Sequence, residues 1–119
     1  MQQGPPHPIG TGSKSIDLTG ALFPWEGEQP VFMRMPGSSF LYLPCFTEVD
    51  KLRLIMARIG VFSYSVKQIE DGPDFLTSFD VPGAEDIRVI LDPHFLEDGK
   101  VRFTQVAKPG APISTRDWA

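Results

Sequence analysis

A chain of 119 residues has room for one domain with one hydrophobic core. It contains nine phenylalanines and twelve prolines, which is typical of an aromatic core connected by many turns. The net charge is −4 and the lysines and arginines are scattered, which argues against nucleic-acid binding because that activity normally needs a basic face.

The hydropathy pattern and the cysteine content indicate a cytoplasmic protein. No apolar run is long enough to span a bilayer, and the start MQQGPPHPIG lacks the basic residues and apolar stretch of a signal peptide. The single cysteine, Cys45, excludes an internal disulfide and a thiolate-rich zinc site. We therefore expect no cofactor and no metal ion, and neither nucleic acid nor membrane as a partner.

Both ends of the chain are rich in small and turn-forming residues. Residues 1–15 (MQQGPPHPIGTGSKS) offer almost nothing to bury, which predicts a flexible arm. Residues 108–119 are similar and predict a C-terminal tail, in which Trp118 is the one residue suited to docking in a groove. Residues 16–107 are predicted to form a single domain.

The first core elements surround a Pro-Gly turn. Apolar runs over 31–35 and 40–46 flank the turn residues PGSS, which predicts a β-hairpin. The second run, FLYLPCF, is apolar on both faces, as expected of a central strand that is covered on each side. Pro44 cannot donate a ladder hydrogen bond, so we expect the pairing to fray near it.

A helix is predicted directly after this strand. Thr47 is the expected N-cap, with Asp50 completing a variant of the capping box, and Gly60 is the expected C-terminal stop. One apolar stripe at helical spacing predicts the buried face. Its members are Val49, Leu52, Ile55, Met56 and Ile59.

The remaining pattern alternates strands and turns. Turns are predicted at Asp92–Pro93 and over 97–100. The other expected elements are a half-buried strand over 62–67, a short helix over 74–79, and strands over 87–91 and 101–106. The predicted fold is α+β, with a mixed, mainly antiparallel sheet of about five strands packed with one main helix and one short helix.

Cys45 is the first candidate for chemistry. Helix N-termini stabilise thiolates, and Cys45 lies two residues before the expected cap, so His94 could serve as its base and Asp92 could orient that base. Against this reading, Cys45 alternates with apolar residues, and nearby carboxylates would raise the pKa of its thiol. Free cysteines are also among the most buried residues, so a packing role is favoured.

The sequence offers no stronger catalytic or metal motif. Asp92, His94, Glu97 and Asp98 cluster near a glycine, but their spacing matches no calcium loop or zinc motif, and acidic residues suit a hairpin turn. No glycine-rich phosphate loop and no G-x-S-x-G motif is present. An enzyme is therefore not predicted.

Aromatic residues are the candidate partner or ligand surface. They are Phe23, Trp25, Phe32 and Tyr64. Phe23 and Trp25 would either close one end of the core or remain outside as an interaction patch, and core closure is slightly favoured. An unpaired sheet edge beside aromatic flanks also predicts a homodimer.

Two stretches resemble the N-terminal domains of SseB-type proteins. In FLYLPCFTEVDKL a strand ends near a proline and a Phe-Thr pair opens a helix, and IRVILDPHF is similar to that family's apolar strand ending in an Asn-Pro or Asp-Pro turn. The resemblance covers about residues 31–106 and departs from the family at Cys45 and His94. It implies a small bacterial module with regulatory or protein-interaction roles, including secretion- and toxin-related ones, and no established catalytic residues.

Three functional hypotheses follow. The first is a non-enzymatic bacterial protein-interaction or regulatory module, dimeric, that uses a sheet edge or an aromatic surface. The second is a small-ligand-binding domain with an apolar pocket between helix and sheet, lined by Phe46, Met56, Phe62 and Tyr64. The third is a cysteine-dependent enzyme built on Cys45 and His94.

Overall fold

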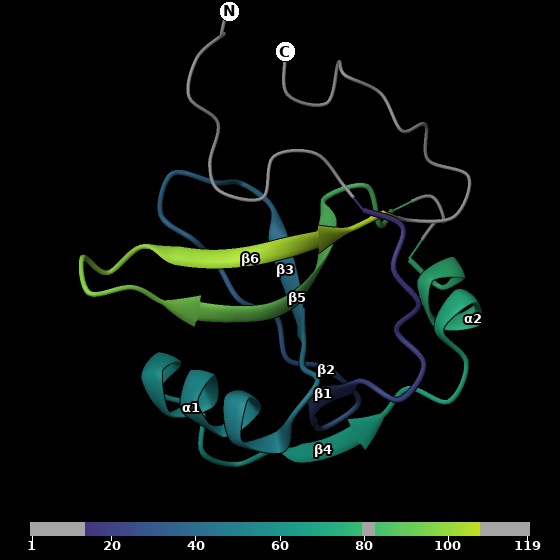
Figure 1. Cartoon of the computed structure of the whole chain (residues 1–119), viewed down its shortest axis with the longest axis horizontal. Helices are drawn as coiled ribbons and strands as arrows, with labels where there is room; N and C mark the ends of the chain where they lie inside the picture. Colours follow the sequence, from purple (N-terminus) through teal and green to yellow (C-terminus); the bar gives the residue numbers. More distant parts are fainter. Residues whose placement is uncertain (1–13, 80–82, 108–119) are drawn as a thin grey trace, which may run out of the picture.

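A computed structural model describes residues 14–79 and 83–107, which form an α+β fold, as predicted (Figure 1). The elements in chain order are β1 (Leu22–Glu26), β2 (Gln29–Pro30), β3 (Leu41–Cys45), α1 (Val49–Ile59), β4 (Ser65–Gln68), α2 (Gly72–Thr77), β5 (Ile87–Phe95) and β6 (Val101–Val106). None of the helices in these two ranges is long and apolar enough to cross a membrane.

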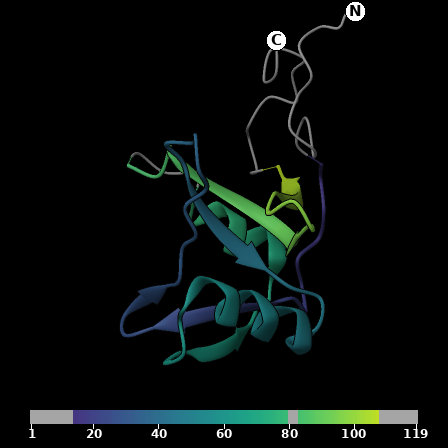
Figure 2. The same ribbon diagram turned by 90° about the vertical axis from the view of Figure 1, so that its left-hand side faces the viewer.

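The strands form two sheets of three, where the sequence predicted one sheet of about five. The first sheet has the order β2-β1-β4 and its pairs are antiparallel. The second has the order β3-β5-β6, with β5 parallel to β3 and antiparallel to β6. Figure 2 shows β1 and β4 as a layer below β3 and β5. A parallel pair needs a long crossover, and here α1, β4 and α2 occupy it.

One residue pair joins the two sheets, and another is what remains of the hairpin predicted from residues 31–35 and 40–46. The backbones of Leu22 and Phe46 exchange two hydrogen bonds of 2.8 Å, which links the end of β3 to β1. Met33 and Tyr42 form one antiparallel bridge, and residues 31–35 form no longer strand. The predicted hairpin is therefore reduced to one bridge, and the strand that pairs with β3 along its length is β5.

β3 lies at the edge of its sheet, so the prediction of a central strand is wrong in topology. Its burial is nevertheless as expected, since four of its five residues are buried. Side chains alternate along a strand, and here successive residues enter two different hydrophobic clusters. Leu43 and Cys45 belong to the first cluster, and Tyr42 belongs to the second.

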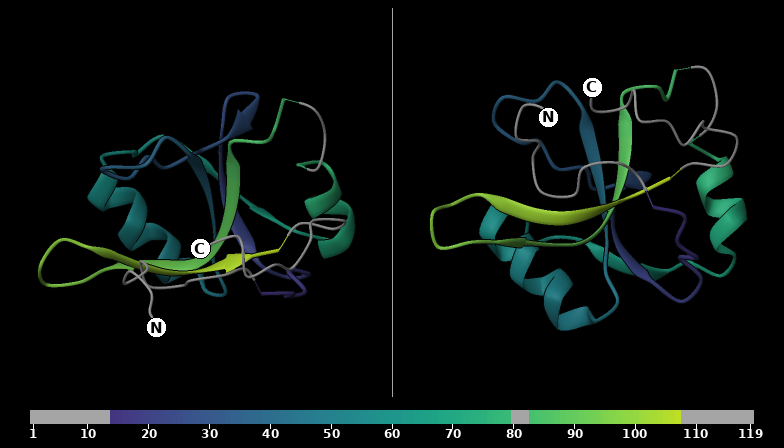
Figure 3. Two further views of the ribbon diagram at one scale, coloured as in Figure 1. Left: turned by 90° about the horizontal axis from the view of Figure 1, so that it is seen from above. Right: turned by 45° about the horizontal axis from the view of Figure 1, so that its top comes forward.

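The two clusters divide the core between the helices. α1 and α2 lie at opposite ends of the molecule (Figure 3). The first cluster includes Leu43, Cys45 and Val89 from the sheet and Leu76 from α2. The second includes Tyr42 and Ile90 from the sheet and Leu52, Ile55 and Met56 from α1. The predicted apolar stripe of α1 is therefore the buried face that carries one half of the core.

The ends of α1 differ in how well the sequence predicts them. Gly60 ends the helix as expected, in the left-handed conformation at φ 81°, which glycine adopts without steric cost. The N-cap, however, is Glu48 rather than Thr47, and its side chain makes no capping hydrogen bond. Thr47 lies one residue before the N-cap, and its hydroxyl donates a hydrogen bond to Asp92.

Two predictions about the later strands are corrected. β4 begins at Ser65 and all four of its residues are exposed, so the half-buried strand over 62–67 is wrong. None of its four residues packs against either hydrophobic cluster, and β4 is an edge strand whose only partner strand in the described sheets is β1. The predicted turn at Asp92–Pro93 is a β-bulge inside β5, because the register shifts between Leu91 and His94. A bulge accommodates a proline, which lacks a ladder donor.

The short helix and the last hairpin agree with the sequence. α2 begins two residues before the predicted start of 74 and is capped by Asp71, which accepts a hydrogen bond from the Asp74 backbone. The turn over 97–100 connects β5 to β6, with Gly99 at φ 85°.

The predicted arm and tail fall largely outside the described residues. Residues 1–13 and 108–119, which include Trp118, are among those not described. Lys14, the first described residue, belongs to the domain rather than to an arm. Its amide donates to Gln105 at 2.9 Å and its carbonyl accepts from Ala107 at 2.7 Å, a parallel bridge beside β6.

Candidate functional site

The candidate site is a hollow of about 1020 Å³ between α1 and the β5–β6 hairpin. The hairpin extends beyond the body of the molecule on the side where α1 lies (Figures 1 and 3). The residues that line the hollow are Lys14, Lys51, Leu54, Ile55, Ala57, Arg58, Leu91, Asp92, Pro93, His94, Phe95, Arg102, Phe103, Thr104 and Gln105. Cationic, apolar and aromatic side chains therefore meet on one surface.

The hollow has the opposite charge to the chain as a whole. Four lysines and arginines line it against one carboxylate, Asp92, an excess of three positive charges with His94 neutral. The whole chain has a net charge of −4. The scattered cations of the sequence are thus gathered in part by the fold, and the local potential favours an anionic partner.

One face of α1 forms a wall of the hollow. Lys51, Leu54 and Arg58 are three, four and seven residues apart, which places them on neighbouring helical positions beside the buried stripe. Leu54 is 72% exposed, unlike the apolar residues of the stripe. The Arg58 guanidinium lies 4.5 Å from the centroid of the Phe95 ring, so a cation–π contact orients it toward β5.

Asp92 fixes α1 to β5 at the base of the hollow. Its carboxylate accepts two hydrogen bonds of 2.9 Å from Thr47, one from the amide and one from the hydroxyl. Lys51 Nζ lies 3.4 Å from the same carboxylate. This is the only ion pair within the described residues, so Lys14, Arg58 and Arg102 have no carboxylate partner there.

Cys45 and His94 do not form a catalytic pair. Cys45 is fully buried in the first cluster, and burial, aided by the charge of Asp92, raises the pKa of its thiol well above the ordinary range. His94 is exposed, and its Nδ1 lies 3.3 Å from the Asp92 carbonyl oxygen. A nucleophile must be ionised and accessible, and this thiol is neither. Its position is that of a packing residue.

The four aromatic residues singled out from the sequence do not form one exposed patch. Phe23 is buried in the first cluster, and Trp25 and Phe32 pack against that cluster while partly exposed. The Trp25 indole donates a hydrogen bond to the Gly27 carbonyl, and Lys67 lies over its ring at 3.9 Å. Tyr64 packs against the second cluster, away from the other three. Phe23 thus closes the core, the favoured alternative.

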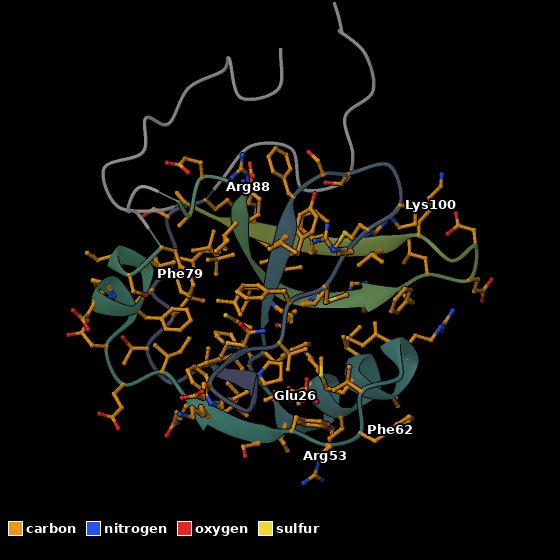
Figure 4. All side chains as sticks on the ribbon, turned by 180° about the vertical axis from the view of Figure 1, so that it is seen from behind. Glu26, Arg53, Phe62, Phe79, Arg88 and Lys100 are labelled. Atoms are coloured by element: carbon orange, nitrogen blue, oxygen red, sulfur yellow. The ribbon has the colours of Figure 1, made fainter. Side chains whose placement is uncertain are left out.

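The predicted apolar ligand pocket is filled. Phe46 and Met56 are fully buried and pack together in the second cluster. Phe62 is 79% exposed and points away from the core, as Figure 4 shows. The four residues therefore enclose no common cavity, and the hollow described above is formed by other residues.

The acidic cluster near the last turn is dispersed. Asp92 binds Thr47, whereas Asp98 accepts a hydrogen bond from the Lys100 amide within the turn. Across the two described ranges, no group of three or more His, Cys, Asp or Glu side chains is placed to hold a metal ion.

Sequence reasoning missed the cations of the hollow. The spacing of Lys51, Leu54 and Arg58 was visible in the sequence, because residues three and four positions apart share one side of the predicted helix. Arg102 gave no such signal, because only the hairpin geometry brings it to the same surface as α1.

Comparison with known proteins finds no match for this chain among protein-family models, curated protein sequences or solved structures. The resemblance to SseB-type N-terminal domains stays a prediction, and the geometry of the hollow is the remaining guide to function.

Proposed function

We propose that this chain is a small, non-enzymatic protein-interaction module, and that the hollow between α1 and the β5–β6 hairpin is its binding surface. The observation that carries the proposal is the exposed Leu54 between Lys51 and Arg58 on the wall of the hollow. Interfaces combine desolvated apolar anchors with arginines and aromatic rings, and this surface supplies all three.

The burial of Cys45 supports a binding role over a cysteine-dependent reaction. The thiol of Cys45 is buried in the core, and the one hydrogen-bond neighbour of the exposed His94 ring within the described residues is the backbone carbonyl of Asp92. The free, buried thiol also suits a cytoplasmic location, as the SseB-type resemblance suits a bacterial regulatory module.

Self-association through β4 is the second candidate, because the sequence predicts a homodimer. β4 is an edge strand with four exposed residues, and Val66 within it and Phe62 just before it are exposed hydrophobic residues. Edge strands pair readily with a second copy. Light scattering after size-exclusion chromatography tests this: a dimer that Val66→Lys converts to a monomer supports pairing through β4, and a monomeric wild type contradicts it.

A site-specific photo-crosslinker tests the main proposal. Benzoylphenylalanine placed at position 54 would lie in the wall of the hollow, and the same group at position 53 is the matched control. Arg53 is on the same helix but does not line the hollow, and it points to solvent in Figure 4.

We expect a cross-linked protein in cells at position 54 but not at position 53. The purified partner should then bind the wild-type chain and lose binding to Leu54→Asp. Equal cross-linking at both positions, or a partner that binds Leu54→Asp normally, would contradict the proposal.

A further inference from the structure

We infer that the partner of the hollow is an acidic protein segment that carries an apolar anchor side chain. This inference rests on the proposed function and names the chemistry of its partner. The carboxylates of the segment meet the cations of both walls, and its anchor packs on Leu54.

The charge of the hollow argues against a basic partner segment. A basic segment would meet Lys14, Lys51, Arg58 and Arg102 with only Asp92 to offset them. Asp92 is itself occupied by Thr47 and Lys51. An acidic segment instead finds three cations without a carboxylate partner in the described part of the chain. The overall charge of −4 repels acidic molecules elsewhere, which makes the hollow the preferred approach.

Arg58 is oriented in advance for carboxylate binding. Its guanidinium carbon lies 4.5 Å from the centroid of the Phe95 ring, and this cation–π contact restrains the side chain. Within the described residues no carboxylate pairs with Arg58, so its N–H donors are available for a bidentate carboxylate contact. Less side-chain entropy is then lost when the partner binds.

The spread of the cations favours a polypeptide over a single phosphate group. Lys51 and Arg58 are seven residues apart on α1, which separates them by about 10 Å along the helix axis. Arg102 lies on β6, across the hollow from the helix. Leu54 stands between the helix cations with 72% of its surface exposed. One phosphate would reach few of these groups, whereas a chain of alternating acidic and apolar residues reaches them together.

The test is a selection of random linear peptides displayed on phage, followed by binding measurements on the full chain. Enriched peptides are synthesised with a fluorescent label, and anisotropy gives their Kd for each protein. The site variants are Arg58→Glu and Arg102→Glu. Their matched controls are Arg53→Glu on the same helix and Lys100→Glu in the same hairpin, since neither control residue lines the hollow. Both control side chains are labelled in Figure 4.

We expect enriched peptides rich in Asp and Glu that contain at least one large apolar residue. Arg58→Glu and Arg102→Glu should each weaken binding about tenfold, because each replaces an attraction by a repulsion, and the controls should change it less than about twofold. Replacing the peptide carboxylates by amides, or raising the salt concentration, should weaken binding similarly.

Other outcomes separate this inference from the proposed function. Neutral or basic peptides whose binding is lost in Leu54→Asp would overturn the acidic partner and leave the interaction module standing. Failure to enrich any peptide, or binding that ignores Arg58, Arg102 and Leu54, would overturn both. A dimer of the wild-type chain that Arg58→Glu dissociates would show a second copy in the hollow, which also overturns the acidic partner.

Discussion

Removing the carboxylate of Asp92 should destabilise the fold more than its half-exposed position suggests. The carboxylate ties the bulge of β5 to Thr47, two residues before the start of α1, through two 2.9 Å hydrogen bonds. Asp92 is also the only described residue other than glycine with a positive φ, at 50°. Aspartate tolerates this conformation better than most residues. The side chain and the backbone conformation of Asp92 therefore both affect the free energy of unfolding, and substitutions by alanine and by glycine distinguish the two effects.

The magnitudes follow from these contacts. Two hydrogen bonds to a partly exposed carboxylate contribute about 2 kcal/mol together, and the exposed Lys51 pair adds less than about 0.5 kcal/mol. Alanine at positive φ adds about 1 kcal/mol of backbone strain, whereas glycine adds none. We expect Asp92→Ala to lower the free energy of unfolding by about 3 kcal/mol and Asp92→Gly by about 2 kcal/mol.

Urea unfolding followed by circular dichroism measures both changes, and the slope of the transition should stay constant. Thr47→Val retains the amide donor but loses the hydroxyl, so it should cost about 1 kcal/mol. The double variant Thr47→Val with Asp92→Ala should lower the free energy of unfolding by clearly less than the sum of the two single variants. The reason is that each single variant already removes the same hydrogen bond, from the Thr47 hydroxyl to Asp92. Strict additivity, or an Asp92→Ala variant within about 0.5 kcal/mol of wild type, would refute this account of the bulge.

Three further predictions concern the core and the surface. Burial raises the pKa of the Cys45 thiol in the folded state, so its contribution to the free energy of unfolding is fully present below the ordinary pKa near 9. Above that pH the free energy of unfolding should fall by about 1.4 kcal/mol per pH unit on account of this thiol. Urea titrations at alkaline pH should show that Cys45→Ala lacks this part of the slope. Gly72→Ala should cost about 2 kcal/mol in thermal unfolding, because a Cβ there would lie 2.8 Å from the Leu18 nitrogen, and an unchanged melting temperature would contradict this packing. Phe62→Ser should change stability by less than about 0.5 kcal/mol, whereas Phe46→Ala should cost about 4 kcal/mol, and similar costs for the two would contradict the placement of these rings.

Features set by neighbouring residues were predictable from the sequence. The apolar stripe of α1, its end at Gly60 and the turn between β5 and β6 depend on helical spacing or on one glycine. Such signals act over a few residues and survive in most tertiary contexts.

Features set by distant partners were not predictable. Thr47 has the chemistry of an N-cap, but the helix starts one residue later than expected, and Thr47 instead binds Asp92, which lies far along the chain. The Asp92–Pro93 pair is typical of a turn, yet β5 pairs with β6 both before it, at Leu91, and after it, at His94. The strand therefore continues through these two residues as a β-bulge. The alternation of apolar and polar residues over 62–67 predicts a strand with one buried face, but the neighbouring residues do not indicate that β4 lies at a sheet edge with all four residues exposed.

The candidate site likewise combines residues that are close in the sequence with residues that only the fold brings together. Lys51, Leu54 and Arg58 share a helix, so their common face was readable from spacing alone. Lys14 and Arg102 join them only because β6 pairs with β5 and Lys14 pairs beside Val106.

The parallel pairing of β3 with β5 also has a consequence for the order of folding. Leu41 pairs with Ile87, so β3 cannot complete its sheet until the whole crossover and β5 have been synthesised. On the ribosome, α1 can form early, but Leu43 and Cys45 remain without their partner strand until β5 has emerged. A nascent chain stalled before β5 should therefore expose an apolar strand edge.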